Sequence, residues 1–193
     1  MPLTDAEKWN SIYSSGDHSQ NDVAEILRNY SYLLPETGNA LDIACGTGNN
    51  SLFLASQGLE THAWDISEQA ISRLQAAARQ NHLEIYTEIR DVVRFPPDEN
   101  SYDVVFVGHF LDRKLFPAII KALHLEGLLY YQTFTAEKTD ITGPQNPEYL
   151  LAPNELLRLC KELHILLYRE EGKTGNSDQG FRNRAMLIGQ RRH

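Results

Sequence analysis

The residues best suited to chemistry lie in two neighbouring segments of the chain. Residues 40–50 read Ala-Leu-Asp-Ile-Ala-Cys-Gly-Thr-Gly-Asn-Asn, and residues 63–67 read Ala-Trp-Asp-Ile-Ser. The small residues at Ala44 and the two glycines that follow it allow a ligand to approach the main chain closely. Asp65 ends the second apolar run and can accept hydrogen bonds from both hydroxyls of a ribose. Together the two segments predict a nucleotide pocket.

Apolar runs and helical periodicity predict the elements that must position these residues. The expected strands are residues 41–44, 59–65, 83–89, 102–107, 128–134, 165–170 and 181–188. The expected helices are residues 4–34 with a break at 14–22, residues 49–57, residues 67–81 with Ser67 as N-cap, residues 117–125 and residues 153–163. This order predicts an α/β fold with a doubly wound, seven-stranded and mostly parallel sheet. The polar connection at 172–180 predicts a C-terminal antiparallel hairpin.

In such a sheet, ligands bind beyond the carboxyl ends of the strands. Residues 44–48, Asp65, Asp91 and residues 107–111 all follow expected strands, so we expect them along one rim. His109 is the candidate general base at that rim, because the unperturbed pKa of histidine lies near neutrality. A purely structural role for His109 is the alternative.

Composition narrows the function classes. The 193 residues, 41% hydrophobic and 23% charged, predict a single globular domain. The net charge of -8 disfavours a nucleic-acid partner, since such binding depends on cations that neutralise phosphates. The spacing of Cys45 and Cys160 fits neither a metal site nor a disulfide framework, so we expect no metal and a reducing cytoplasm. With no signal-like leader and no long apolar run, we expect no membrane association.

A dinucleotide is the first alternative for the ligand. The dehydrogenase fingerprint requires a third glycine after the turn, and Ser51 stands where that glycine would be. About forty residues also precede the first expected strand, which could cover a bound ligand. An NAD(P) site is therefore disfavoured.

The segment Asp42-Ile-Ala44-Cys-Gly46-Thr-Gly48 resembles motif I of the class I S-adenosylmethionine-dependent methyltransferases, with alanine replacing one glycine. The resemblance continues through Asp65, Asp91 and the terminal hairpin. The chain also shows a narrower likeness to the small tellurite-resistance-type methyltransferases related to thiopurine methyltransferases. This likeness is carried by Trp9-x-x-x-Tyr13 and by residues 48–50, 53–55, 112–117, 131–134 and 143–151. The Pro-Gly-Gly usual before the fifth strand is Leu125-Glu-Gly127 here.

The resemblance implies S-adenosylmethionine as cofactor and a role for each matching residue. Asp42 would lie near the cofactor's ammonium, Asp65 would hold the ribose, and Asp91 would accept from the adenine amine. The implied cofactor-binding residues are Trp9, Tyr13, Asp42, Ala44, Cys45, Gly46, Gly48, Asn50, Asp65, Ile66, Asp91, Val92, Gly108 and Phe110.

The predicted function is methyl transfer from S-adenosylmethionine to a small-molecule acceptor such as a thiol or a chalcogen oxyanion. A catalytically inactive cofactor-binding regulator or partner protein is the alternative. A nucleic-acid methyltransferase is disfavoured, because residues 107–111 lack the Asn/Asp-Pro-Pro-aromatic segment. We expect residues 1–35 to form a helical cap, 36–134 the cofactor-binding half and 135–193 the acceptor side of a single domain, in a monomer or homodimer.

Overall fold

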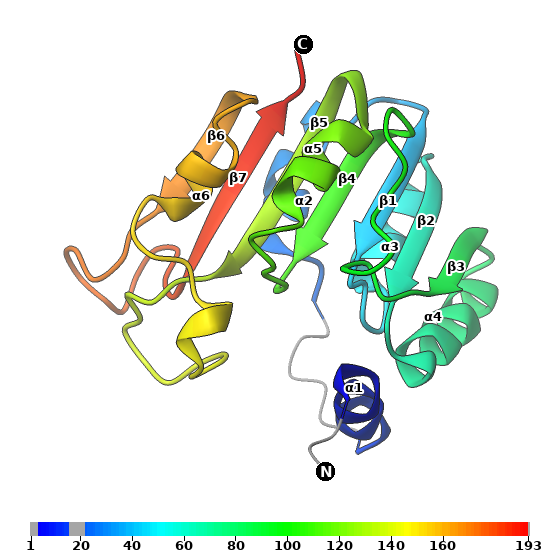
Figure 1. Cartoon of the computed structure of the whole chain (residues 1–193), viewed down its shortest axis with the longest axis horizontal. Coiled ribbons are helices and arrows are strands. Elements are labelled where there is room, and N and C mark those ends of the chain that lie inside the picture. Colours follow the sequence, from blue (N-terminus) through cyan, green and yellow to red (C-terminus); the bar gives the residue numbers. More distant parts are fainter. Residues whose placement is uncertain (1–3, 16–21, 193) are drawn as a thin grey trace.

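A seven-stranded sheet organises the protein, whose computed structural model describes residues 4–15 and 22–192 (Figure 1). The strands are β1 (Asn39–Ile43), β2 (Glu60–Asp65), β3 (Ile85–Ile89), β4 (Tyr102–Gly108), β5 (Leu123–Phe134), β6 (His164–Glu170) and β7 (Arg184–Gln190). Their order is β3-β2-β1-β4-β5-β7-β6. The pairs within β1 to β5 are parallel, whereas β7 is antiparallel to both β5 and β6. The predicted mostly parallel sheet and its antiparallel hairpin are confirmed.

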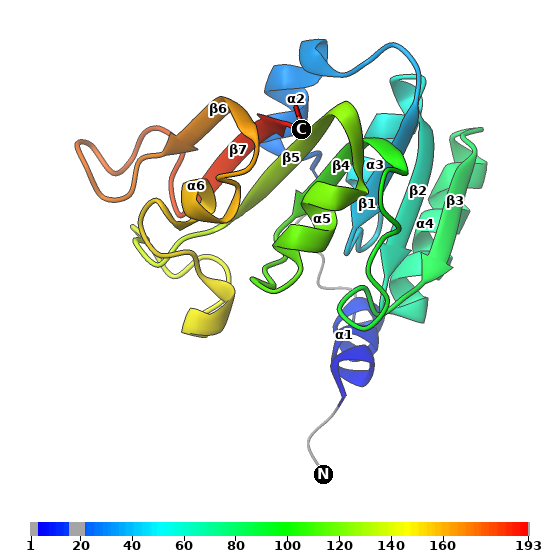
Figure 2. The same ribbon diagram turned by 45° about the horizontal axis from the view of Figure 1, so that its top comes forward.

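Helices cover both faces of the sheet. The helices are α1 (Asp5–Ser14), α2 (Glu25–Tyr30), α3 (Asn49–Ser56), α4 (Glu68–Gln80), α5 (Phe116–Ala122) and α6 (Glu155–Leu159), with 3-10 turns at Ser31–Leu33 and Pro147–Tyr149. Helices α2, α3 and α4 pack on one face, and α5 and α6 pack on the other (Figure 2). Helix α1 lies beyond the carboxyl ends of β1 and β2 (Figure 1). No helix within the described residues has the length and apolar character needed to cross a bilayer.

Strand β5 shows how one strand supplies both cores, because successive side chains point to opposite faces. Tyr130 packs beneath α2 and donates its hydroxyl to the Tyr30 carbonyl at 3.0 Å. Tyr131 packs beneath α5, 4.9 Å from the ring of Phe116, and donates to the Phe110 carbonyl at 2.8 Å. Each buried hydroxyl therefore has an acceptor, and the second one fixes the segment that follows β4.

Helix α4 begins as predicted. The Ser67 hydroxyl accepts from the Ala70 N–H at 3.2 Å, which caps one of the free amides of the first turn. The inward positions Ala70, Ile71 and Leu74 are buried, and Ala78 continues the same stripe. This packing places the start of α4 next to the end of β2.

The helix predicted for residues 117–125 is too long. It ends at Ala122, and Leu123 already pairs with Tyr102 of β4. A bulge follows, in which Glu126 takes a φ of 67° and donates its N–H to the Arg191 carbonyl at 2.7 Å. These pairings with distant strands outweigh the local helical pattern.

Two C-terminal boundaries also differ from the prediction. The helix expected over residues 153–163 is confined to α6, and the strand expected over 181–188 is shifted to Arg184–Gln190. Asn183 interrupts that strand with a φ of 63°, and its side-chain oxygen accepts from the Thr139 N–H at 2.7 Å. The predicted break at 14–22 lies largely outside the described residues, since 16–21 are not among them.

Candidate active site

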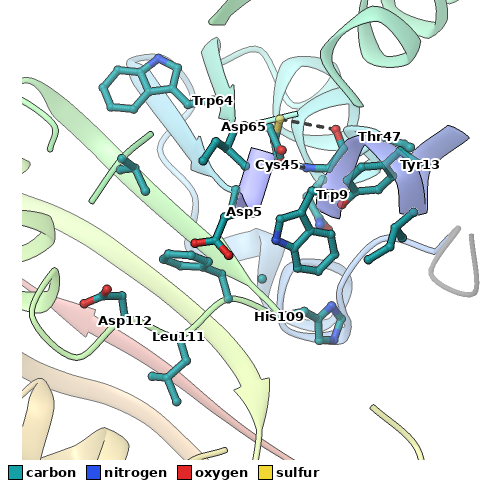
Figure 3. Close-up of a pocket in the computed structure, with 18 of the residues that line it drawn as sticks. Asp5, Trp9, Tyr13, Cys45, Thr47, Trp64, Asp65, His109, Leu111 and Asp112 are labelled. Atoms are coloured by element: carbon teal, nitrogen blue, oxygen red, sulfur yellow. Dashed lines mark hydrogen bonds between the residues drawn. The ribbon is translucent and has the colours of Figure 1, made fainter. Parts of the chain in front are cut away.

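A cavity of about 530 Å³ lies at the carboxyl ends of β1, β2 and β4 (Figure 3). Its walls come from the turn after β1, the ends of β2 and β4, the segment after β3, helix α1 and the loop after β5. The volume is within the range of about 300–1,000 Å³ typical of small-molecule sites. Because the strand order reverses between β1 and β4, the cavity lies at the switch point of the sheet.

The turn after β1 is built from left-handed residues. Ala44 and Gly46 have φ values of 55° and 56°, a conformation that costs a non-glycine residue roughly 1–2 kcal/mol. A Cβ on Gly46 would lie 2.8 Å from the Tyr13 hydroxyl oxygen, and one on Gly48 would overlap Leu74. The two glycines are therefore required by space as well as by backbone conformation.

Asp65 connects this turn to helix α4. One carboxylate oxygen accepts from the Gly46 N–H at 2.8 Å, and the other accepts from the Ser67 N–H at 2.8 Å. The side chain is only 6% exposed, and burial raises the pKa of its carboxyl. Each carboxylate oxygen has a second lone pair, so Asp65 can still accept from ribose hydroxyls.

The segment after β3 forms a second wall of the cavity. Val92 is buried and Ile66 is half-buried, and both line the cavity beside Asp91. One Asp91 oxygen accepts from the N–H groups of Val93 and Arg94, at 3.1 and 3.3 Å. This turn presents an apolar surface and a carboxylate edge to a flat ring such as adenine.

Helix α1 covers the cavity. The rings of Trp9 and Tyr13 are stacked with centroids 5.9 Å apart, and both line the cavity. The Asn10 side-chain oxygen accepts from the Ser67 hydroxyl at 2.7 Å and from the Gln69 N–H at 3.3 Å. No residue of α1 is buried, so these contacts to α4 hold a helix that has little core packing.

Asn50 connects the site to the start of α2. Its side-chain oxygen accepts from the Ala24 N–H at 2.8 Å, while Gln132 accepts from the Ile26 N–H at 3.1 Å. Both amides belong to the beginning of α2, where helical N–H groups lack partners within the helix. Asn50 thus lines the cavity and also holds the first residues of α2 in place.

His109 follows β4 in a left-handed conformation, with a φ of 56° and its N–H donated to the Gln132 carbonyl at 2.8 Å. Its ring lies 5.0 Å from that of Phe134, and Gly108 and Phe110 line the cavity on either side. Burial, and secondly the positive charge of Arg184, lower the pKa of His109 to about 4. The imidazole is therefore uncharged at neutral pH.

Comparison with known proteins shows which family the chain resembles. The methyltransferase domain family matches residues 40–125. The chain is 33% identical over 146 residues to a probable S-adenosyl-L-methionine-dependent methyltransferase, TehB, from Haemophilus influenzae. The match covers 72% of this chain and 51% of TehB, so the chain spans about half the length of that relative.

Solved structures agree with this match. The TehB crystal structure from H. influenzae superposes with a TM-score of 0.68 at 24% identity, covering 95% of this chain and 67% of that one. A methyltransferase from Aquifex aeolicus superposes with a TM-score of 0.70 at 14% identity, covering 97% and 99%. The chain therefore resembles the class I S-adenosylmethionine-dependent methyltransferases in sequence and in fold. The predicted resemblance and fold are confirmed, and the resemblance implies S-adenosylmethionine as the cofactor.

Asp42 does not line the cavity, and its expected place near the cofactor's ammonium stays a prediction. It is 1% exposed, accepts from the Ser51 hydroxyl at 2.6 Å and is absent from the cavity wall in the described part of the chain. Its neighbours Leu41 and Ile43 pack on the α5 side of the sheet, so alternation along β1 turns Asp42 towards α3. Burial raises the pKa of Asp42 to about 7. All other predicted site residues line the cavity.

Several wall residues of this methyltransferase site were not predicted. They include Asp5, Asp22, Trp64, Arg90, Asp112, Phe134, Pro144 and Tyr149. Asp112 follows β4 and Phe134 ends β5, so the rim argument could have included them. Trp64 carries no such signal, because its place depends on packing. Tyr149 lies in the region expected to form the acceptor side, but nothing in the sequence singled it out. No cluster of three His, Cys, Asp or Glu suited to a metal occurs among the residues described.

Proposed function

We propose that the protein transfers a methyl group from S-adenosylmethionine to a small-molecule acceptor. The observation that carries the proposal is the convergence on one cavity of three separate segments: the glycine turn, Asp65 and the Asp91–Val92 wall. The glycine turn offers a main-chain surface for the methionine part of S-adenosylmethionine, Asp65 offers a hydrogen-bond acceptor for its ribose, and the Asp91–Val92 wall offers a flat apolar surface for its adenine.

When bound, the cofactor supplies a methyl group on a positively charged sulfur. The protein's residues act by position: Asp65 orients the ribose, Ile66 and Val92 enclose the adenine, and Trp9 with Tyr13 covers the site. Holding the two reactants in line can contribute roughly 7–11 kcal/mol to lowering the barrier. We assign His109 to the acceptor side, where its neutral imidazole is able to orient an acceptor by hydrogen bonding.

The acceptor side is formed by residues 135–193, which supply Gly143, Pro144 and Tyr149 to the wall. They complete a single domain with the cap at 1–35 and the cofactor-binding half at 36–134. The thiol or chalcogen oxyanion suggested by the sequence remains one acceptor class for assay. The proposal also includes a cytoplasmic location and a monomeric or homodimeric state. It includes no action on nucleic acid and no association with membranes.

Calorimetry with purified protein tests the proposal. We expect S-adenosylmethionine and S-adenosylhomocysteine to bind below millimolar concentration, and methyl transfer to occur to a member of a thiol, phenol, amine and oxyanion panel. Absence of cofactor binding would refute the proposal. Binding without turnover on a broad panel would favour the inactive regulator instead.

A further inference from the structure

Carboxylates and aromatic rings dominate the part of the cavity that faces away from the glycine turn. Asp112 follows β4 and is half-buried, and Asp5 belongs to the first turn of α1. Figure 3 shows both carboxylates among the side chains that line the cavity. Phe110, Phe134 and Tyr149 complete this wall. An occupant therefore meets flat apolar surfaces and two negative charges.

Among the residues described, few basic side chains lie where they could balance these charges. Arg90 is the one arginine or lysine among the described residues of the wall, and it lies at the adenine end. Its guanidinium is 3.9 Å from the Trp64 ring centroid and donates to the carbonyls of Phe95 and Pro96, at 2.7 and 2.9 Å. Residues 1–3 and 16–21 contain neither lysine nor arginine.

Two further positive groups lie near the wall without forming it. Arg184 is close enough to affect His109, but its guanidinium lies 5.1 Å from the Phe181 ring and outside the described wall. The Lys8 ammonium is 5.4 Å from the Tyr149 ring and 5.7 Å from the Trp9 ring. Two rings of the wall thus already face a cation, the arrangement that cation–π attraction favours.

From this wall we propose that the acceptor is a flat, neutral nitrogen heteroaromatic that becomes a cation on methylation; the inference rests on the proposed function. The lone pair of the ring nitrogen forms the new bond to the methyl carbon as the carbon–sulfur bond breaks and its electron pair remains on sulfur. The positive charge passes from sulfur to nitrogen, and no proton leaves.

The wall suits this reaction because positive charge grows on the acceptor in the transition state. Asp5, Asp112 and the ring faces attract that charge, and a neutral His109 adds no opposing one. A thiolate or an oxyanion would instead be repelled by two carboxylates, against which the Lys8 ammonium beside the Trp9 and Tyr149 rings sets a single positive charge. An acceptor that loses no proton also needs no base, which agrees with an imidazole as weakly basic as His109.

Three bicyclic probes of the same shape test the inference by binding to the protein saturated with S-adenosylhomocysteine. They are 1-methylquinolinium, 1-methylnaphthalene and 1-naphthoate, with charges of +1, 0 and -1. We expect the cation to bind at least tenfold more tightly than the anion in fluorescence or calorimetric titration. Equal binding of the three, no binding of any, or preference for the naphthoate overturns the inference.

Variants test whether the two acids of this wall cause the preference for the cationic probe. Asp112→Asn and Asp5→Asn together are expected to reduce the advantage of 1-methylquinolinium over 1-methylnaphthalene about fivefold, while affinity for S-adenosylhomocysteine changes less than twofold. Glu162→Gln, which removes an exposed acid far from the cavity, is the matched control and leaves the preference unchanged. A preference that survives the double substitution contradicts the inference.

Turnover separates this inference from the proposed function. Labelled methyl transfer is measured with quinoline, thiophenol and tellurite as acceptors. Transfer to quinoline supports the inference, and transfer to thiophenol or tellurite alone overturns it while leaving the proposed function intact. Failure of the wild-type protein to bind S-adenosylhomocysteine at all overturns both.

Discussion

Asp65 holds together three parts of the site, since its carboxylate bonds to the glycine turn and to the start of α4 and also lines the cavity. In Asp65→Asn, an amide NH₂ would face either the Gly46 or the Ser67 N–H, and one acceptor for ribose would be lost. We expect affinity for S-adenosylhomocysteine to fall tenfold or more, about 1.4 kcal/mol, by calorimetry. The free energy of unfolding is a poorer measure of the role of Asp65 than cofactor affinity. Losing a hydrogen bond lowers this free energy, whereas removing a buried charge raises it. Asp98→Asn, at an exposed acid, serves as control, and unchanged affinity in Asp65→Asn would contradict the assignment.

Asp42 makes stability depend on pH. Its pKa in the folded protein is raised to about 7 by burial, well above the value of about 3.9 that an unperturbed aspartate has. Its contribution to stability is therefore fully present below about pH 4 and is lost as pH rises through 7, with an amplitude of up to about 4 kcal/mol. Asp42→Asn should remove this dependence while keeping an acceptor for Ser51.

The measurement is urea denaturation of wild type and Asp42→Asn between pH 4.5 and 8. The lowered pKa of His109 makes the free energy of unfolding rise with pH over part of this range, opposite to the effect of Asp42. The raised pKa of Asp65 makes it fall with pH, as Asp42 does. The difference between the two proteins isolates Asp42. Parallel stability curves would show that the carboxyl titrates normally.

At the scale of elements, helix α1 is attached more by polar contacts than by core packing. Asn10→Ala removes the acceptor for the Ser67 hydroxyl and the Gln69 N–H. We expect several-fold weaker binding of S-adenosylhomocysteine with nearly unchanged thermal stability, because α1 contributes no buried residue. Ser11→Ala, at an exposed position of the same helix, is the control. A large fall in the midpoint of thermal unfolding, with affinity preserved, would contradict a covering role.

We expect the loop after β5 to contribute to the acceptor side alone. Gly143, Pro144 and Tyr149 reach the wall, while the cofactor residues come from β1 to β4 and α1. Tyr149→Ala is therefore expected to change the relative rates on different acceptors severalfold while cofactor affinity stays within a factor of two. Steady-state kinetics on two acceptors and calorimetry make the comparison. Equal loss of both properties would place the loop in cofactor binding.

Elements with strong local signals could be predicted from sequence. Helix α4 has its Ser67 cap and its inward stripe where expected, and the glycine turn follows β1 as expected. Strand β5 could not be bounded locally, because Leu123 follows its pairing with Tyr102 rather than the pattern of the preceding helix. The start of β7 likewise depends on Asn183 and its distant partner Thr139.

The site residues divide in the same way into those that the sequence could predict and those that depend on distant contacts. The fold places strand ends on one rim, so Ala44, Asp65, Asp91 and His109 reach the cavity as predicted. Asp42 does not, because a motif match gives a position along a strand but not the face towards which a side chain points. Asp5 and Asp112 also escaped prediction, and Asp5 reaches the cavity only because α1 packs against α4.

At the scale of the whole molecule, cofactor binding should stabilise the entire fold, because the cavity joins α1, four strand ends and the loop after β5. A ligand at 100 times its Kd contributes about 2.7 kcal/mol to the free energy of unfolding. For a chain of 193 residues this corresponds to a rise of about 5–10 °C in the midpoint of thermal unfolding. We expect this rise with S-adenosylhomocysteine and a much smaller one with NADH. In Asp65→Asn at the same concentration of S-adenosylhomocysteine, a tenfold weaker affinity leaves about 1.4 kcal/mol, so the rise should be at most about half as large. Differential scanning calorimetry measures all three, and a larger shift with NADH would mean that the glycine turn holds a pyrophosphate after all.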